Sequence, residues 1–511
     1  MEIELKLLLD QEGCRKLREH PLIERLKAGG PEHRDLLAIY FDTPDFLFRK
    51  HDAGLRVRQS NGQWMQTMKA GGSVQGGLHQ RHEWEGPADG SRPDLGRLRA
   101  LVGPGTEWSS LLATQSLDER LQELFAVKVG RLAWDLRMGE TDIELVLDEG
   151  TIERDGRQDP VSEIELELKS GDPAGLFELA LRLLDDIPMR LGNRSKAERG
   201  YALCKPPSRG VVKAEPPRLA REASVEQGLQ AILDNCLAQI QGNEDGVIEG
   251  EDPECLHQMR VGIRRLRSAL KLFEPAVHCP ASLSDELEWL GGELGAARDW
   301  EVLASATLAR LEEAPAGAEQ LAALRDAMPA IVNERRRQAA QVLMSPRYAR
   351  LRLSLLAWLL GAKWREDADL DRLRLLDSPL RDFADATLAR NVQRMHKRGK
   401  RLRKASPEAL HRLRIACKKS RYALEFFQSL YRPRRVRRYL AALSRLQDEL
   451  GWRNDLAVAD GLLRQLQSTH PQLGAAPAFA RGYMASQGRT GQRALRRGWK
   501  TLRALKMPRL A

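Results

Sequence analysis

The sequence predicts an α+β domain built on antiparallel strands, followed by a linker and an all-α domain of two repeated helical bundles. Three observations predict this. Charged and apolar residues alternate over much of the first 170 residues, and period two gives a strand one polar and one apolar face. Residues 205–224 carry four prolines and no sustained periodicity. Beyond them apolar residues recur at helical spacing, and one helical segment is repeated.

The predicted strands are joined by short turns. The alternation is clearest in five stretches, residues 2–6, 55–58, 81–85, 142–145 and 163–169. Ser60-Asn61-Gly62 separates two strand-like runs and is typical of a hairpin turn, and Gly139-Glu140-Thr141 is a second candidate. An antiparallel meander follows from these turns.

The charged faces of these strands are candidates for a polar interior. A single strand of this kind usually turns its charged face to water, but five such strands favour a barrel whose charged faces meet inside. Charges buried there need compensation, which a polyanion with divalent cations would supply. Carboxylates suit magnesium or manganese, and basic side chains suit phosphate oxygens. The carboxylates are Glu2, Glu4, Glu165 and Glu167, and the basic residues are Arg56, Arg58, Lys69, Arg81, Arg131 and Lys196.

Several spaced motifs in this half resemble one known superfamily. Glu2-x-Glu4-x-Lys6 matches the ExExK signature of the CYTH, or triphosphate tunnel metalloenzyme, superfamily. The motifs that strengthen the match are Tyr40-Phe-Asp-Thr-Pro44, Leu55-Arg56-Val-Arg58, Met68-Lys69, Arg81-x-Glu83-x-Glu85, Leu147-Asp148-x-Gly150, Glu163-x-Glu165-x-Glu167 and Ser195-Lys196-x-x-Arg199-Gly200-Tyr201. The resemblance covers residues 1–204 and implies an eight-stranded antiparallel tunnel that holds a triphosphate.

The resemblance also implies roles for individual residues. Magnesium or manganese is the implied cofactor, held by Glu2, Glu4, Glu165 and Glu167 with Asp148 as a further candidate, while Glu163 is ambiguous. Lys6 and Glu83 are the candidate catalytic residues, and no general base can be named. The implied triphosphate-binding residues are Lys6, Arg56, Arg58, Lys69, Arg81, Arg131 and Lys196.

The helical half contains a repeated basic stripe. The segment 257–273 aligns without a gap on 411–427, and 294–299 is echoed by 450–455. At 100° per residue the basic groups of each segment project from one helix face, where they repel each other unless an anion lies along them. A partly protonated imidazole at each start would add to phosphate binding. The candidate polyphosphate-binding residues are His257, Arg260, Arg264, Arg267, His411, Arg414, Lys418 and Arg421.

This repeat resembles the CHAD family, helical domains associated with polyphosphate binding. The resemblance covers residues 218–511. We therefore predict a tunnel domain at 1–204, a linker at 205–224 and a helical domain at 225–511, with repeats at about 225–365 and 375–511.

The charge distribution limits the partners. The net charge of +11 divides into −7 for residues 1–205 and +18 for the remainder, so the second half is the polyanion-binding candidate. Nucleic acid is the competing polyanion, but the basic run at 390–404, which includes Arg394, Lys397, Arg398, Lys400, Arg401, Arg403 and Lys404, has no interleaved aromatic residues to stack on bases. The oligomeric state is not predicted.

Cysteine usage and hydropathy indicate the compartment. The six cysteines form no CxxC pair and are expected to be reduced thiols. The most apolar run, 353–362, is too short to span a bilayer, and the acidic start resembles no signal segment. We expect no membrane contact and a location in the cytoplasm, extending to polyphosphate granules.

Together these features predict an enzyme that hydrolyses inorganic triphosphate to pyrophosphate and phosphate, joined to a module that binds polyphosphate. Two alternatives remain. One is a non-enzymatic polyphosphate anchor whose tunnel senses triphosphates, and the other is a tunnel enzyme acting on thiamine triphosphate or a nucleoside triphosphate.

Overall fold

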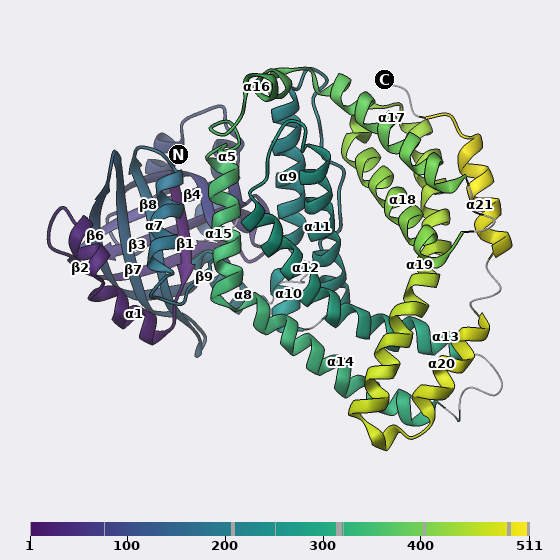
Figure 1. Ribbon diagram of the computed structural model, residues 1–511. Coiled ribbons are helices and arrows are strands. Elements are labelled where there is room, and N and C mark those ends of the chain that lie inside the picture. The colour runs from purple at the N-terminus through teal and green to yellow at the C-terminus, as the bar shows by residue number, and fades with distance from the viewer. Residues whose placement is uncertain are drawn as a thin grey trace. The chain divides into compact units, whose positions relative to one another are not determined.

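A computed structural model describes residues 2–75, 77–205, 210–250, 252–312, 319, 321–400, 402, 405–487 and 492–507. The predicted linker's residues 206–209 lie outside this set. The chain divides into two compact units (Figure 1). The first comprises Met1–Gly210 with Met344–Gly361, and the second comprises Val211–Leu343 with Ala362–Ala511.

The first unit contains the predicted closed barrel. Its strands follow the order β5-β4-β3-β2-β6-β7-β8-β1, pairing of β5 with β1 closes the ring, and a short β9 adds to β1. Every described pairing is antiparallel, so the predicted eight-stranded antiparallel barrel is confirmed. The strands are β1 (Glu2–Leu8), β2 (Glu32–Asp42), β3 (Ala53–Ser60), β4 (Gln63–Gln75), β5 (Leu78–Pro87), β6 (Gln122–Met138), β7 (Thr141–Arg154), β8 (Arg157–Ser170) and β9 (Arg190–Leu191).

Both predicted hairpin turns are present. Ser60 pairs with Gln63 across a two-residue turn in which Asn61 and Gly62 have φ of 50° and 79°. Positive φ at both central residues gives a turn whose twist matches that of the strands. Met138 pairs with Thr141 across the second turn, which also has two central residues.

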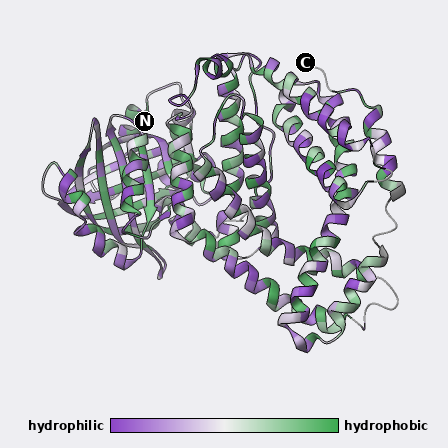
Figure 2. Cartoon of the chain, viewed as in Figure 1, coloured by the Kyte–Doolittle hydropathy of each residue, from purple (hydrophilic) through white to green (hydrophobic). Residues whose placement is uncertain are grey.

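The apolar faces of the strands point outward and pack beneath helices, as expected (Figure 2). Phe41, Leu55, Val57 and Met68 form one such core together with residues of α4 and α5. The interior is thereby left to the charged faces. The helices of this unit are α1 (Gln11–Arg18), α2 (Pro21–Leu26), α3 (Leu47–Lys50), α4 (Leu95–Val102), α5 (Glu107–Leu112), α6 (Leu117–Arg120), α7 (Ala174–Leu183), α8 (Lys196–Cys204) and α15 (Pro346–Leu360).

The second unit is helical in its described residues, as predicted. Its helices are α9 (Val225–Gln241), α10 (Glu244–Glu249), α11 (Pro253–Leu272), α12 (Ala281–Val302), a π-helix η1 (Leu303–Leu308), α13 (Ala309–Glu312), α14 (Ala322–Leu343), α16 (Leu370–Asp377), α17 (Leu380–Gly399), α18 (Pro407–Phe427), η3 (Gln428–Leu430), α19 (Pro433–Thr469), η4 (Pro471–Leu473), α20 (Ala476–Gln487) and α21 (Gln492–Ala504).

The two repeated segments occupy equivalent helices. The first lies on α11 and is followed by α12, and the second lies on α18 and is followed by α19. Met259, Ile263 and Leu266 of α11 are buried, as are Leu413 and Cys417 of α18. The apolar face of each repeat therefore packs in the core.

The helix α15 belongs to the barrel unit although it lies far along the chain. It packs against α7, and Arg350 forms an ion pair of 2.7 Å with Asp185. Its apolar residues explain the short hydrophobic run in the sequence. No helix among the described residues is long and apolar enough to cross a membrane.

Candidate functional site

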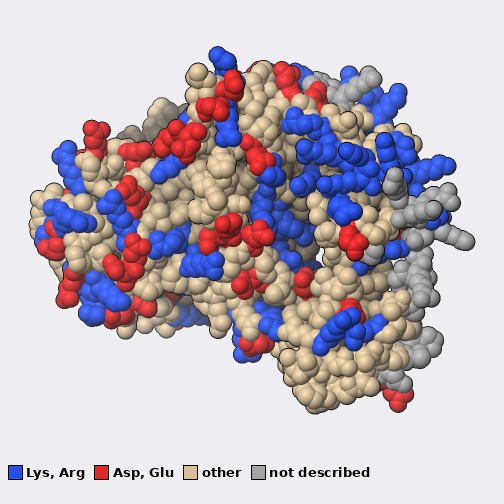
Figure 3. Space-filling model, in the orientation of Figure 1, with Lys and Arg blue, Asp and Glu red and all other residues tan. Residues whose placement is uncertain are grey.

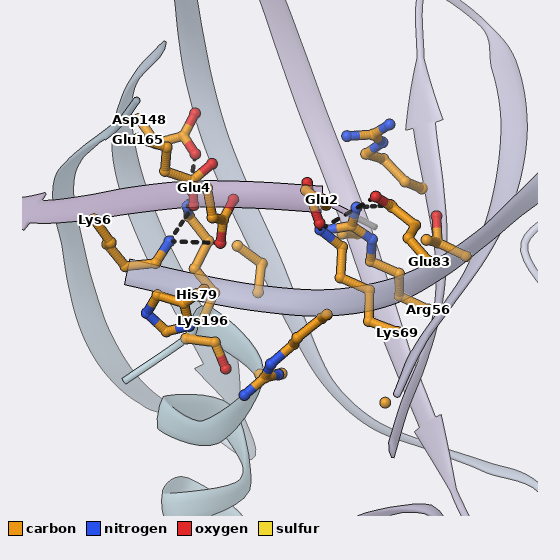
Figure 4. Close-up of a pocket in the computed structure, with 18 of the residues that line it drawn as sticks. Glu2, Glu4, Lys6, Arg56, Lys69, His79, Glu83, Asp148, Glu165 and Lys196 are labelled. Carbon is orange, nitrogen blue, oxygen red and sulfur yellow. Dashed lines mark hydrogen bonds and ion pairs between the residues drawn. The ribbon is translucent and has the colours of Figure 1, made fainter. Parts of the chain in front are cut away.

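The barrel encloses one charged cavity of about 660 Å³ (Figure 4). Every residue that the sequence suggested for metal binding, triphosphate binding or catalysis in this half lines it. These residues are Glu2, Glu4, Lys6, Arg56, Arg58, Lys69, Arg81, Glu83, Arg131, Asp148, Glu165, Glu167 and Lys196. The cavity therefore brings together the carboxylates and cations of seven of the eight long strands and of α8.

Strand register places specific side chains beside one another. Residues directly opposite on adjacent antiparallel strands share a face, with Cβ atoms about 5 Å apart. Lys6 of β1 lies opposite Glu165 of β8, and Arg131 of β6 lies opposite Asp148 of β7. Asp148 in turn lies opposite Glu163. Both oppositely charged pairs become direct ion pairs.

One end of the cavity is an ion-pair cluster centred on two lysines. Lys6 donates to Glu165, and its Nζ lies 2.9 Å from Glu163. Lys196, at the start of α8, lies 2.6 Å from Asp148, 2.6 Å from Glu163 and 3.0 Å from Glu165. Each lysine neutralises more than one carboxylate, so the cluster holds itself together without a ligand.

The cluster keeps its members charged. Burial opposes the charge on Lys6, but Glu163, Glu165 and Glu4 hold its pKa well above the usual value. Burial likewise disfavours the Glu165 carboxylate, yet Lys196 and Lys6 hold its pKa well below the usual range. These opposite shifts stabilise both charges in a site with little solvent.

Arg131 joins the same cluster. It donates two hydrogen bonds of 2.8 and 2.7 Å to Asp148, whose side chain is fully buried, and a third of 3.1 Å to Glu165. Asp148 is thus held by a bidentate arginine as well as by Lys196, which leaves it less available to a metal than its motif suggested.

A row of carboxylates lies beside this cluster. Glu167 of β8 is opposite both Glu4 of β1 and Glu144 of β7. Lys169 bonds Glu144 and Glu167 at 2.9 and 3.0 Å, but its side chain is 43% exposed. Burial raises the pKa of Glu167, and the charges of Glu2 and Glu144 raise it further against the pull of Lys169. This row carries uncompensated negative charge.

The carboxylates of this row do not form a closed metal cage. Among the described ranges, no three His, Cys, Asp or Glu side chains converge closely enough to hold a metal ion as they stand. Metal binding there would require the side chains to move toward a shared ion.

The other end of the cavity is predominantly cationic. Figure 4 shows Glu2, Arg56, Lys69 and Glu83 gathered there, apart from the Lys6 cluster. Lys69 lies 2.5 Å from Glu2 and 3.6 Å from Glu83, and Arg56 lies 3.8 Å from Glu83. Glu83 therefore lies between two cations.

Two further arginines complete this end. Arg58 donates to Glu85 at 3.2 Å, and Arg81 lies 3.8 Å from Glu198. Burial and the charge of Arg56 lower the pKa of Arg58. An anion bound here would relieve the crowding of positive charge.

Sequence reasoning missed some residues of the cavity. Arg34, Glu144 and Lys169 line it as well. Glu144 and Asp148 lie on the same face of β7, because alternate residues of a strand share a face. Extending the period-two argument along β7 would therefore have identified Glu144. Glu163 is explained by its contacts, because it lies behind both lysines and receives Arg199 at 3.4 Å.

The helix α8 is anchored so that Lys196 enters the cavity. Ser195 caps its N-terminus and forms a capping box with Glu198. Tyr201 donates a hydrogen bond of 2.7 Å to the buried Asp42, which also accepts from the backbone of Phe48. The motif around Lys196 thus places the lysine side chain in the cavity and also anchors α8.

In the helical unit, the basic stripes of the two repeats approach each other. Lys418 of α18 is buried near Arg260 and Arg264 of α11 as well as near Arg414 and Arg421 of its own helix. Burial and these positive charges lower the pKa of Lys418 to about 7. The two stripes therefore contribute to a common cationic site.

The matching arginines Arg260 and Arg414 have different polar partners in the two repeats, because Asn454 aligns with Arg298 and not with Asp299. Arg260 lies 3.5 Å from Asp299 of α12, and Arg414 donates to Asn454 of α19 at 3.2 Å. Arg267 forms an ion pair of 2.8 Å with Glu288, so it lies at the edge of the stripe.

The two histidines differ from expectation and from each other. Burial and the neighbouring Arg298 lower the pKa of His257 to about 4, so its ring is neutral at neutral pH. The expected partial charge on His257 is therefore wrong. His411 is exposed and lines a different cavity from that of the barrel, between α18, α19 and α20.

Residues 390–399 of the basic run 390–404 lie within α17. Arg390, Arg394, Lys397 and Arg398 are exposed, and Figure 3 shows Lys and Arg side chains gathered over this helix. Arg401, Arg403 and Lys404 lie outside the described residues.

Comparison with known proteins identifies both halves. The CYTH domain model matches residues 1–201, and the CHAD domain model matches residues 231–464. An inorganic triphosphatase from Haemophilus influenzae is 34% identical over 175 residues, which are 34% of this chain and 47% of that protein. The chain thus spans about half the length of the curated relative that it matches.

Solved structures resemble each half separately. The CHAD domain from the plant Ricinus communis is 44% identical with a TM-score of 0.53, covering 59% of this chain and 99% of that one. The Hippeastrum protein HpAC1, described as having a dominant triphosphatase activity, is 19% identical with a TM-score of 0.30, covering 38% and 93%. The second likeness carries no argument about function. The barrel half matches the CYTH domain model, and the chain belongs to the CHAD family through its helical half.

Proposed function

We propose that the barrel hydrolyses inorganic triphosphate to pyrophosphate and phosphate with the help of a divalent cation, and that the helical unit binds polyphosphate. The observation that carries the proposal is the division of one cavity into a cationic end and an acidic row. A triphosphate and a hard cation need these two surfaces side by side. The similarity to an inorganic triphosphatase supports the same reaction.

The cationic end would bind the phosphate chain. Arg56, Arg58, Lys69 and Arg81 all line the cavity, and the carboxylates nearest the three arginines are 3.2 Å or more away. Phosphate oxygens can replace such contacts with charge-assisted hydrogen bonds, in a bidentate manner for arginine. These four residues would therefore orient the substrate along the tunnel.

The acidic row fits a divalent cation. Glu4, Glu144 and Glu167 supply only oxygen donors from three adjacent strands, and burial, with the charges of Glu2 and Glu144, raises the pKa of Glu167. Magnesium and manganese prefer oxygen ligands and bridge carboxylates to phosphates. Such a cation, when bound, would neutralise phosphate charge and activate water. Glu2 and Glu165, from the predicted ligand set, border this row.

Lys6 and Lys196 would complete the site from the cluster end. Both are held charged by buried carboxylates, so each presents a fixed positive charge near the reacting phosphate. Glu83 lies between Arg56 and Lys69 and would keep those cations in place. The role of proton acceptor is assigned to no side chain.

The polyphosphate proposal rests on the meeting of the two basic stripes. Burial, together with the charges of Arg264, Arg414, Arg260 and Arg421, lowers the pKa of Lys418 to about 7, so basic groups of both repeats lie near this lysine. A flexible chain of phosphates would neutralise this site, and the presence of such a module favours an inorganic chain as substrate of the tunnel. Magnesium or manganese and a cytoplasmic location belong to the same proposal.

A substrate panel tests the proposal. Phosphate release would be measured for tripolyphosphate, ATP and thiamine triphosphate, with magnesium, with manganese and with a chelator. We expect metal-dependent release that is fastest from tripolyphosphate. Faster release from ATP or thiamine triphosphate would overturn the assigned substrate, and release unaffected by the chelator would overturn the metal requirement.

One observation favours a sensor as the second candidate. Asp148, Glu163 and Glu165 are already neutralised by Lys6, Lys196 and Arg131, which leaves fewer free carboxylates than a two-metal hydrolase would use. Tight tripolyphosphate binding without release of phosphate under any metal condition would support the sensor.

A further inference from the structure

A cavity in the second helical repeat borders the proposed polyphosphate site, with which it shares Arg414. It has a volume of about 700 Å³ and lies between α18, α19 and α20. In size it matches pockets that hold small organic molecules, which span roughly 300–1,000 Å³. Its wall combines an apolar surface with basic groups and two carboxylates, Glu408 and Asp460. The apolar residues are Leu410, Leu450, Leu456, Ala457, Met484 and Ala485.

Two of the basic groups have nitrogens that lack a partner. Nη2 of Arg453 and Nε of Arg414 are buried and form no hydrogen bond with the described residues. Among the described residues, the side chain of Arg414 donates a hydrogen bond to the neutral Asn454 alone. Because a buried donor without a partner is unfavourable, a ligand acceptor at these nitrogens would be favoured.

The first repeat provides an internal comparison. Extending the alignment of 294–299 on 450–455 puts Glu301 opposite Ala457. Glu301 is 3% exposed and accepts from Arg298 at 2.9 Å and from Arg336 at 2.7 Å, so the cations of the smaller, 440 Å³ cavity beside it are neutralised by the protein.

The second repeat lacks that carboxylate. Ala457 leaves space where Glu301 stands in the first repeat, and Arg453 replaces Ala297. Asp460 also lines the cavity, but it is bonded to Arg481 at 2.8 Å and to Arg464 at 2.9 Å. The second cavity is therefore larger, and Arg414 and Arg453 keep buried nitrogens there that have no hydrogen-bond partner among the described residues.

We propose that this cavity binds an amphipathic organic anion, in which a carboxylate or phosphate head contacts Arg453 and Arg414 and an apolar body packs on the leucines and Met484. The head supplies the acceptors that the buried nitrogens lack, and the body removes apolar surface from water. The proposal does not require the hydrolysis in the barrel, and it shares Arg414, but not Arg453, with the proposed polyphosphate site.

Binding of three matched probes to the full chain tests the proposal. Decanoate, decyl phosphate and decanol share one apolar body and differ in the head, and isothermal titration calorimetry measures each below its aggregation concentration. We expect at least one anion to bind at least tenfold more tightly than decanol. The better anion identifies the head group. Equal affinity of decanol, or binding of neither anion, would overturn the proposal.

Variants on α19 locate the binding. Arg453→Met should weaken anion binding about tenfold and leave decanol binding unchanged, because it keeps the apolar stem and removes the charge. Ala457→Phe should abolish binding of every probe by filling the space. Arg445→Met and Ala441→Phe are the matched controls, since both residues are exposed on the same helix outside the cavity.

The thermal unfolding midpoint of each variant distinguishes a folded protein whose cavity is filled from a variant that does not fold. If Ala457→Phe does not fold, Arg453→Met alone decides. An unchanged affinity in Arg453→Met, or an equal loss in Arg445→Met, would place the anion elsewhere and contradict the assignment.

Discussion

At the scale of single residues, the barrel interior depends on charges that compensate each other. Lys196 is the clearest case, because its ammonium group lies within 3.0 Å of Asp148, Glu163 and Glu165 while its side chain is 10% exposed. Burying three carboxylates is tolerable only because this lysine, Lys6 and Arg131 are buried with them.

Removing this lysine should destabilise the barrel. We expect Lys196→Met to lower the free energy of unfolding by about 3 kcal/mol, since it leaves buried carboxylates short of a cation. Urea denaturation monitored by tryptophan fluorescence measures this. Lys169→Met is the control, because an ion pair of a 43% exposed lysine contributes at most about 1 kcal/mol. Equal losses in the two variants would contradict the cluster's role.

Lys418 gives the helical unit a dependence on pH. Its folded pKa of about 7 is below the usual lysine value, so the lysine is charged below pH 7 and neutral above it. Polyphosphate binding to the full chain should therefore weaken about fivefold between about pH 6 and pH 8.5, which corresponds to roughly 1 kcal/mol. In Lys418→Arg the side chain stays charged, and this part of the pH dependence should disappear.

The same shift predicts the opposite trend for stability without ligand. Because the unfolded chain keeps the proton on Lys418 above pH 7, the unfolded state binds more protons there, and stability should rise with pH toward the usual lysine pKa. Thermal unfolding of the wild type and of Lys418→Arg measures the difference. A wild type whose binding and stability follow the arginine variant at every pH would show that Lys418 does not titrate in this range.

At the scale of elements, close contact between β6 and β7 requires a glycine next to Asp148. A Cβ on Gly150 would lie 1.9 Å from the carbonyl oxygen of Lys128. Gly150→Ala should therefore cost about 3 kcal/mol of stability by pushing the strands apart. Gly54→Ala is the stability control, because its Cβ would meet nothing within 4 Å. If both variants unfold at the same denaturant concentration, the contact is not as tight as described.

Elements were largely predictable from the sequence, but their partners were not. Period-two alternation predicted β1, β3, β5, β7 and β8, because charged and apolar faces of a strand differ whatever it pairs with. Register is set by pairing across the barrel, and no pattern in β7 alone reveals that Glu144 meets Glu167. The self-neutralised cluster around Lys196 was missed for the same reason. Considered alone, each of its residues looked available to bind a metal ion or a phosphate.

At the scale of the whole molecule, charge separates the helical repeats as well as the two halves. Residues 225–343 hold 11 basic and 20 acidic residues, whereas residues 362–511 hold 35 and 13. The net positive charge of the helical half therefore comes from the second repeat. The shared motif predicted two similar bundles, but only residue-by-residue counting distinguishes their electrostatic character.

The barrel unit is not contained in the N-terminal segment alone. The helix α15, from residues 346–360, packs against α7, and its helical pattern gave no hint of that partner. A chain ending after Cys204 should therefore unfold at a lower temperature than the barrel of the full chain and bind more of an apolar fluorescent dye. An unchanged unfolding temperature would show that α15 contributes little.

The central claim is that the tunnel carboxylates serve catalysis, and tripolyphosphate hydrolysis by Glu4→Gln and Glu167→Gln, with binding measured in parallel, tests it most directly. Glu149→Gln is the matched control, because Glu149 follows Asp148 on β7 and pairs with Arg18 outside the cavity. We predict that both tunnel variants lose at least about 100-fold in hydrolysis while still binding tripolyphosphate, and that the control keeps its activity. Full activity in Glu4→Gln and Glu167→Gln, or a wild type that binds but does not hydrolyse, would contradict the account.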